Sequence, residues 1–155
     1  MKKIICYILV AITTICCFTA CSNNTPKEVD VNAIYNEIEA AVTIPDFIEL
    51  TSADISDYIA VDSADVKQMV VKISAEAISA DQVVICEGTD SAAADRIEAA
   101  FKTYLDSVKK SFENYLPSEF AKMEDIEVNR SGNYVYYAVS SEISTIEAIF
   151  DKYFK

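Results

Sequence analysis

Three tyrosines near the carboxyl end are the most distinctive side chains that could recognise a ligand. Tyr134, Tyr136 and Tyr137 lie in one short segment with the pattern of a β-strand. If Val135, Tyr137 and Val139 face the core, Tyr134 and Tyr136 face the other way, because successive strand side chains alternate. Exposed tyrosines bind sugars and peptides well, so Tyr134 and Tyr136 form a possible recognition surface. The alternative is that both rings lie under a helix or pair across a hairpin.

Carboxylates gather in a second segment, where Asp54, Asp57, Asp62 and Asp65 follow one another closely. Calcium needs several oxygen ligands, but its usual loops place acids around a glycine, and this segment has none. Two carboxylates could also act as general acid and base, although nothing in the spacing indicates it. We expect helix caps and turns here, and whether residues 54–65 bind a cation stays open.

Cys86 is the one cysteine beyond position 21, and the chain contains no histidine. The missing histidines exclude Ser-His-Asp and Cys-His catalysis and the usual zinc sites. A reactive thiol needs a nearby base or positive field, so Cys86 is expected to be a small buried residue. The chain also has no glycine-rich phosphate loop and no nucleophile elbow. The sequence therefore predicts no catalytic residue, no cofactor and no metal.

The first twenty residues have the order of a secretory signal. Lys2 and Lys3 precede the uncharged run Ile4–Ala20, and Cys21 follows directly. The end of this run, Phe-Thr-Ala-Cys, resembles the bacterial lipobox, although Phe18 stands where leucine is usual. The resemblance implies that residues 1–20 are removed and that Cys21 carries a thioether-linked diacylglycerol.

Two alternatives to lipidation remain for this leader. An ordinary signal peptidase prefers a small residue at the position of Phe18, so simple secretion fits less well. An uncleaved anchor would need about 20 apolar residues, which makes the run Ile4–Ala20 short. The leading prediction is a lipid-anchored tether over residues 21–30, polar and containing Pro26, and a single domain over residues 31–155 on the extracytoplasmic face of the membrane.

The net charge of −12 bears on the possible partners. Lys2 and Lys3 are the only charged residues among the first twenty, so the remainder carries −14. Such a chain repels phosphate backbones, which excludes nucleic acid as a partner. It also repels anionic lipid headgroups, so membrane attachment would depend on the lipid at Cys21.

Hydrophobic periodicity predicts the elements that must position these residues. Helices are expected at 31–42, 52–58, 89–115, 117–123 and from Ser141 or Ser144 to the end. Strands are expected at 66–77, 82–87, 126–130 and 133–140, with a tight turn at Ser131-Gly132. The main elements then run helix, two strands, helix, two strands, helix. This order predicts an α+β fold, with a four-stranded, mainly antiparallel sheet and helices packed on one face.

Two segments resemble an uncharacterised lipoprotein family, domain-of-unknown-function family 4358. They are SFENYLP at residues 111–117, after a charged amphipathic helix, and GNYV at residues 132–135. The lipobox and the early Ala33-Ile34-Tyr35 helix are also similar, and the resemblance covers about residues 30–154. Members are common in Gram-positive gut bacteria of the clostridial group. The resemblance implies an envelope location and a fold, and it brings no activity.

The sequence favours a membrane-anchored surface lipoprotein that acts as a non-catalytic binding module for an envelope protein, peptide or glycan. Such a module predicts a patch built on Tyr134 and Tyr136. A carboxylate-dependent envelope hydrolase is the first alternative, and it predicts two carboxylates converging in a pocket, one with a raised pKa. A structural assembly subunit is the second, and it predicts a large exposed apolar patch.

Overall fold

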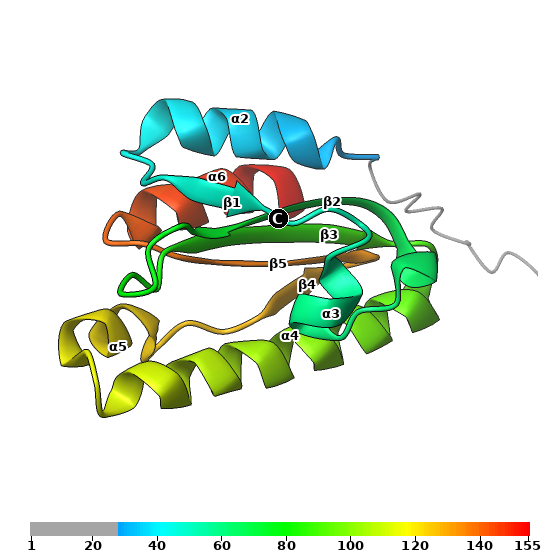
Figure 1. Cartoon of the computed structure of the whole chain (residues 1–155). Coiled ribbons are helices and arrows are strands. Elements are labelled where there is room, and N and C mark those ends of the chain that lie inside the picture. Colours follow the sequence, from blue (N-terminus) through cyan, green and yellow to red (C-terminus); the bar gives the residue numbers. More distant parts are fainter. Residues whose placement is uncertain (1–27) are drawn as a thin grey trace, which may run out of the picture.

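In the computed structural model, which describes residues 28–155, an antiparallel sheet lies between two layers of helices (Figure 1). The predictions for Cys21, for residues 1–20 and for most of the tether concern residues outside this described part. None of the helices within residues 28–155 has the length and apolar character needed to cross a membrane.

Five strands form the sheet. They are β1 (Phe47–Glu49), β2 (Val66–Ser74), β3 (Gln82–Gly88), β4 (Asn129–Ser131) and β5 (Tyr134–Val139). The helices are α2 (Val31–Ala41), α3 (Ile55–Ile59), α4 (Ser91–Glu113), α5 (Pro117–Met123) and α6 (Ile143–Phe154), with one 3-10 turn, η1 (Ser63–Asp65). The strand order is β1-β2-β3-β5-β4, and every neighbouring pair is antiparallel.

The predicted α+β fold with an antiparallel sheet is confirmed, but the predicted number of four strands is wrong. The additional strand is β1, which lies between the predicted helices at 31–42 and 52–58, where no element was predicted. Phe47, Ile48 and Glu49 pair with Ser74, Ile73 and Lys72 of β2. Three residues are too few to show an alternating pattern, so pairing with β2 defines this strand.

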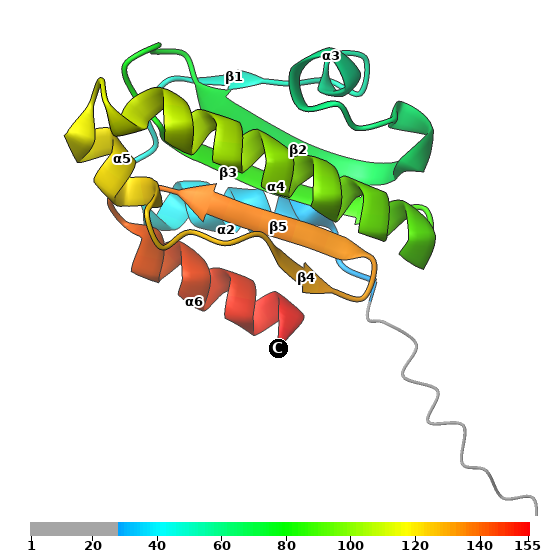
Figure 2. The ribbon, with the colours of Figure 1, turned by 90° about the horizontal axis from the view of Figure 1, so that it is seen from below.

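The prediction that helices pack on one face of the sheet is also wrong. Helices α2 and α6 cover one face, while α4, with α3 and α5, lies on the other (Figures 1 and 2). The physical reason lies in β3 and β5, which are buried at every position. A strand whose two faces are both apolar must be covered on both sides to remove that surface from water.

Each face of the sheet has its own hydrophobic core. The core under α4 includes Val84, Cys86, Ile97, Phe101, Leu105, Val135 and Tyr137. The opposite core includes Ile34, Ile38, Val83, Ile85, Tyr134, Tyr136, Ile146 and Phe150. Both cores are built from residues 28–155, so this part of the chain buries its own apolar surface and forms a folding unit.

Helix α6 is held over β5 by aromatic packing and by contacts with α2. Phe154 stacks on Tyr136 with ring centroids 4.2 Å apart, and Phe150 packs against the same ring at 4.8 Å. Lys152 pairs with Glu37 of α2 at 2.7 Å. Such aromatic pairs add to the free energy gained from buried area, and they fix the height of α6 above the sheet.

The edge of the sheet beside α6 is incomplete. Strand β4 pairs with β5 only from Ser131–Tyr134 to Asn129–Tyr136, while β5 continues to Val139. The preceding chain, residues 124–128, leaves the sheet and runs beside β5 towards α5 (Figure 2). This departure leaves a space between α6 and this edge of the sheet.

Candidate ligand-binding groove

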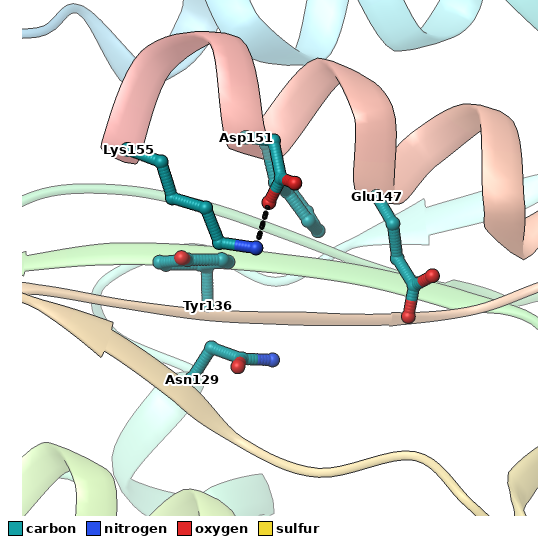
Figure 3. Close-up of a pocket in the computed structure, with 6 residues that line it drawn as sticks. Asn129, Tyr136, Glu147, Asp151 and Lys155 are labelled. Carbon is teal, nitrogen blue, oxygen red and sulfur yellow. Dashed lines mark ion pairs between the residues drawn. The ribbon is translucent and has the colours of Figure 1, made fainter.

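Two adjoining hollows lie between α6 and the β4 edge of the sheet, and together we name them the α6 groove. The larger has a volume of about 220 Å³ and is lined by Asn129, Tyr136, Glu147, Phe150, Asp151 and Lys155 (Figure 3). The smaller, of about 20 Å³, shares three of these residues and is also lined by Ile126, Glu127, Tyr137, Ala138 and Ile143.

A lysine on the opposite face of the sheet helps to keep this groove open. Lys109 of α4 donates from Nζ to the carbonyl oxygens of Glu124 and Ile126, at 3.2 and 2.8 Å. These bonds hold residues 124–126 towards α4 and therefore away from α6. Because β4 begins only at Asn129, no strand fills the space between this segment and α6.

Tyr136 forms the floor of the groove, and its hydroxyl group is open to a ligand. Its side chain is packed under α6, and the residue is 6% exposed. The hydroxyls of Tyr134, Tyr137 and Tyr153 all make hydrogen bonds, but that of Tyr136 has no partner among residues 28–155. Burial raises the pKa of the Tyr136 hydroxyl, which therefore stays protonated and can donate into the groove.

The rim of the groove is mostly acidic. Glu147 and Asp151 stand one turn apart on α6, and Glu127 lines the smaller hollow. Lys155 is the one cation among the lining residues. Its Nζ lies 2.7 Å from Asp151 Oδ1, on the side of the Tyr136 ring that faces α6 (Figure 3). The hydrogen bond to Asp151 raises the pKa of Lys155, which remains charged.

Of the two possibilities raised for Tyr134 and Tyr136, the structure has the second, in which both rings lie under a helix. They lie on one face of β5 as the alternation predicts, but α6 covers that face and leaves them 4% and 6% exposed. An exposed tyrosine patch is therefore absent from β5. Tyr136 still reaches a cavity, whereas Tyr134 is not among the residues that line the groove.

Tyr134 instead holds the first described residues of the chain, in a set of contacts that we name the Val29 clamp. Its hydroxyl accepts a hydrogen bond from the Val29 N–H at 2.9 Å and donates to the Val29 carbonyl at 3.2 Å. Gln68 of β2 donates to the same carbonyl at 2.8 Å and to buried Glu87 at 2.5 Å. Lys67 completes the clamp with an ion pair to Glu87 at 3.0 Å. Both polar backbone groups of Val29 are thus satisfied by side chains of the sheet.

The lone thiol and the acidic segment have structural surroundings. Cys86 is fully buried, and burial raises its pKa to about 12, which leaves the thiol protonated and inert. Asp54 accepts hydrogen bonds from Thr51, and Asp62 caps η1 through the Ala64 N–H. These bonds confirm the interpretation as caps and turns for both acids. Residues 28–155 contain no group of three or more Cys, Asp or Glu residues that could hold a metal ion.

A second hollow, of about 390 Å³, lies on the α4 side of residues 126–128. Lys102, Leu105, Asp106, Lys109, Ile126, Glu127 and Val128 line it. Both of its lysines are engaged, Lys102 with Glu98 and Lys109 with the backbone. No aromatic side chain lines this hollow, whereas Tyr136 and Phe150 line the α6 groove, so the α6 groove is the stronger candidate for a ligand site.

The geometry of the α6 groove suits binding better than acid–base catalysis. Glu147 and Asp151 are exposed and lie on one flank of one helix, so they do not face each other across a closed cleft. A catalytic acid at neutral pH needs burial to raise its pKa. Outside the groove, a side-chain hydrogen bond lowers the pKa of each of the carboxylates Glu37, Asp54, Asp65 and Glu98.

Sequence reasoning missed Asn129, Glu147, Asp151 and Lys155 as groove residues. A signal was present in the last helix, where Glu147, Asp151 and Lys155 recur at four-residue steps beside the apolar face. The same pattern is typical of any solvent-exposed helix face. These residues line a groove only because β4 does not pair with the last part of β5. The exposed large apolar residues, Ile48, Tyr58, Ile78 and Tyr115, come from four different parts of the chain and do not line the groove.

Comparison with known proteins supplies a family and no activity. No curated protein and no solved structure matches the chain. A family model described as a domain of unknown function matches residues 40–140, which contain all five strands and end just before α6. The floor residues Asn129 and Tyr136 lie inside the match, whereas the acids of α6 lie beyond it. The match confirms the resemblance seen in the sequence, and the chain belongs to the family Domain of unknown function (DUF4358).

Proposed function

We propose that this protein is a surface lipoprotein, held on the extracytoplasmic face of the membrane through Cys21, whose domain binds an envelope ligand in the α6 groove without catalysis. The observation that carries the binding role is the Tyr136 hydroxyl, which belongs to a buried ring, lines a cavity and has no partner among residues 28–155. Within residues 28–155 no side-chain polar atom that is sealed from solvent lacks a partner, so the Tyr136 hydroxyl oxygen is open to the groove and a ligand there can accept its hydrogen bond.

The size of the groove supports the same proposal. A water molecule occupies about 30 Å³ in the liquid, so a cavity of about 220 Å³ has room for several waters or for one small ring. The rim residues are exposed side chains that can adjust around a ligand, while the floor is fixed by aromatic stacking. Because the floor is already fixed, only the rim side chains must be ordered when a ligand binds, which limits the entropic cost of binding.

The binding role is tested with the soluble domain, residues 22–155, and washed envelope fragments in a co-sedimentation assay. We expect the double variant Glu147→Gln/Asp151→Asn to lose most of the binding, by tenfold or more. The matched control is Asp57→Asn/Glu113→Gln, which removes the same two charges at exposed positions outside the groove. Equal binding by the two double variants would show that the groove is not the site.

The anchor is supported by the order of the leader, from Lys2 and Lys3 through an uncharged run to Cys21. It is tested by intact-mass analysis of the protein from native membranes. We expect a chain that begins at Cys21 and carries diacylglycerol, and we expect Cys21→Ala to lose the lipid mass. Lipidation is ruled out if both forms retain residues 1–20 and have masses that differ only by the substitution.

A further inference from the structure

The geometry of the α6 groove points to a ligand class: we propose that it binds an unacetylated amino sugar, whose ammonium group replaces that of Lys155. This inference rests on the proposed binding role of the groove and names the chemistry that the groove recognises. It draws on the acceptors around the cavity, on the position of Lys155 and on the open hydroxyl of Tyr136.

The groove offers more acceptors for a cation than its own lysine uses. Lys155 pairs with Asp151, whereas Glu147 lines the same cavity and has no ion-pair partner among residues 28–155. Asn129 donates its amide N–H to the Glu127 carbonyl at 3.2 Å, which leaves its side-chain oxygen as a further acceptor. A ligand ammonium group in this cavity would therefore find two carboxylates and an amide oxygen.

The aromatic floor adds a second reason for a cation. Tyr136 and Phe150 both line the cavity, and Tyr136 is stacked on Phe154. An aromatic ring attracts an ammonium group, and the Lys155 ammonium group lies close enough to Tyr136 to act on its hydroxyl electrostatically (Figure 3). Lys155 thus marks the position that a ligand ammonium group would take.

Lys155 is suited to leave when a ligand arrives. It follows the last residue of α6, its side chain is largely exposed, and one ion pair, to Asp151, holds its ammonium group. Exposed ion pairs contribute little to stability, so exchange of one ammonium for another costs little. The net charge of −12 also concentrates cationic ligands around the domain.

A sugar ring fits the remaining groups better than a lysine side chain from a partner protein. A lysine side chain brings one polar group on an apolar stem, so it would leave the Tyr136 hydroxyl and the Asn129 amide unmatched. An amino sugar carries hydroxyls for both groups, and the C–H face of its ring can pack against the aromatic floor. The volume of about 220 Å³ accommodates one such ring.

The test titrates the domain, residues 22–155, with a glucosamine tetramer and with its fully N-acetylated form by isothermal titration calorimetry. Acetylation removes the positive charge and keeps the sugar, so we expect tenfold or more tighter binding of the free amine. Glu147→Gln should lower the affinity for the amine tenfold, and Tyr136→Phe should lower it several-fold. Asp57→Asn/Glu113→Gln should leave most of the affinity intact, because those acids lie outside the groove.

The displacement of Lys155 is tested separately. Lys155→Met removes the internal competitor and should raise the affinity for the glucosamine tetramer several-fold. Lys110→Met makes the same change of net charge on α4, away from the groove, and should have a smaller effect. Equal effects of the two substitutions would overturn the idea that Lys155 occupies the ligand position.

Other outcomes separate this inference from the proposed function. If both tetramers bind equally, or if n-butylammonium binds as tightly as the amino sugar, the ligand class is wrong. If neither tetramer binds but Glu147→Gln/Asp151→Asn still abolishes binding to envelope fragments, the amino sugar is wrong and the binding role stands. If the wild-type domain binds neither the tetramers nor the envelope fragments, both proposals fail.

Discussion

Neighbouring tyrosines in β5 have different roles because of what their hydroxyls meet. Tyr134 and Tyr136 share one face of the strand, and both are nearly fully buried. The Tyr134 hydroxyl makes two hydrogen bonds with the Val29 backbone, whereas the Tyr136 hydroxyl has no partner among residues 28–155. Replacing each tyrosine by phenylalanine therefore tests whether its hydroxyl stabilises the fold or is free to bind a ligand.

We predict that Tyr134→Phe lowers the free energy of unfolding by about 1–3 kcal/mol, because it leaves a buried backbone group without one of its partners. Tyr136→Phe is the matched control and should stay within about 0.5 kcal/mol, since no protein hydrogen bond is lost. Urea denaturation of residues 22–155, followed by circular dichroism, measures both. An equal loss in the two variants would contradict the Val29 clamp.

For individual residues, the sequence predicted part of the site. Alternation placed Tyr134 and Tyr136 opposite Val135, Tyr137 and Val139, and the two cores confirm that division. Alternation says which side chains share a face, but it does not say what covers the face. The exposure of the two tyrosines depends on α6, which packs on β5 through Phe150 and Phe154. The sequence of the strand itself carries no signal for this tertiary contact.

The junction between β3 and α4 shows how closely two elements approach. A Cβ atom on Gly88 would lie 2.7 Å from the Ala94 backbone nitrogen and 3.0 Å from the Asp90 carbonyl oxygen. Asp90 fixes this corner, because its side chain accepts the Ala93 N–H at 2.8 Å and caps α4. The atoms that surround Gly88 belong to the backbone, so they cannot move aside as a flexible side chain would.

Gly88→Ala should therefore destabilise the domain by about 1–3 kcal/mol through overpacking at this corner. The neighbouring exposed residue provides the control, and Thr89→Ala should change the free energy of unfolding by less than about 0.5 kcal/mol. Both are measured by urea denaturation. A Gly88→Ala domain as stable as the wild type would mean that β3 and α4 can separate at this corner without cost.

The long elements were predictable because their patterns repeat many times. The structure has α4 at Ser91–Glu113, within the predicted 89–115, and α5 at the predicted residues 117–123. β1 could not be predicted, since its three residues form a strand only through pairing with β2. The second helical layer had a signal in the apolar run at residues 83–86 of β3, but which helices cover which face depends on the connections between them.

Over the whole molecule, a few ion pairs tie distant segments together despite the excess of acids. Arg96 of α4 makes two hydrogen bonds to Asp65 of η1, at 2.8 and 2.5 Å. The Arg96 side chain lowers the pKa of Asp65 below its ordinary value of 3.8. The ionised carboxylate is therefore favoured in the folded state over the unfolded state, and its contribution to stability exists only while Asp65 is charged.

The resulting pH dependence can be predicted with its sign. The difference in stability between the wild type and Asp65→Asn should be full above the ordinary pKa of 3.8 and should shrink as the pH falls through the lower pKa of the folded state. The control variant is Asp57→Asn, which removes an exposed acid on α3 outside the ion pair with Arg96. Thermal unfolding across an acidic pH series measures both, and a gap that widens towards low pH would reverse the assigned sign.

The Val29 clamp also decides how a pull along the chain would reach the domain. Tension arriving at residue 28 meets Val29, whose backbone is gripped by Tyr134 of β5 and Gln68 of β2. The force would be divided between two interior strands before it reached the first turn of α2. Helix α2 would then be shielded from peeling off the sheet. The Val29 clamp thus connects the first residues of the domain directly to the sheet, so the sheet, rather than the end of a helix, would resist a stretching force.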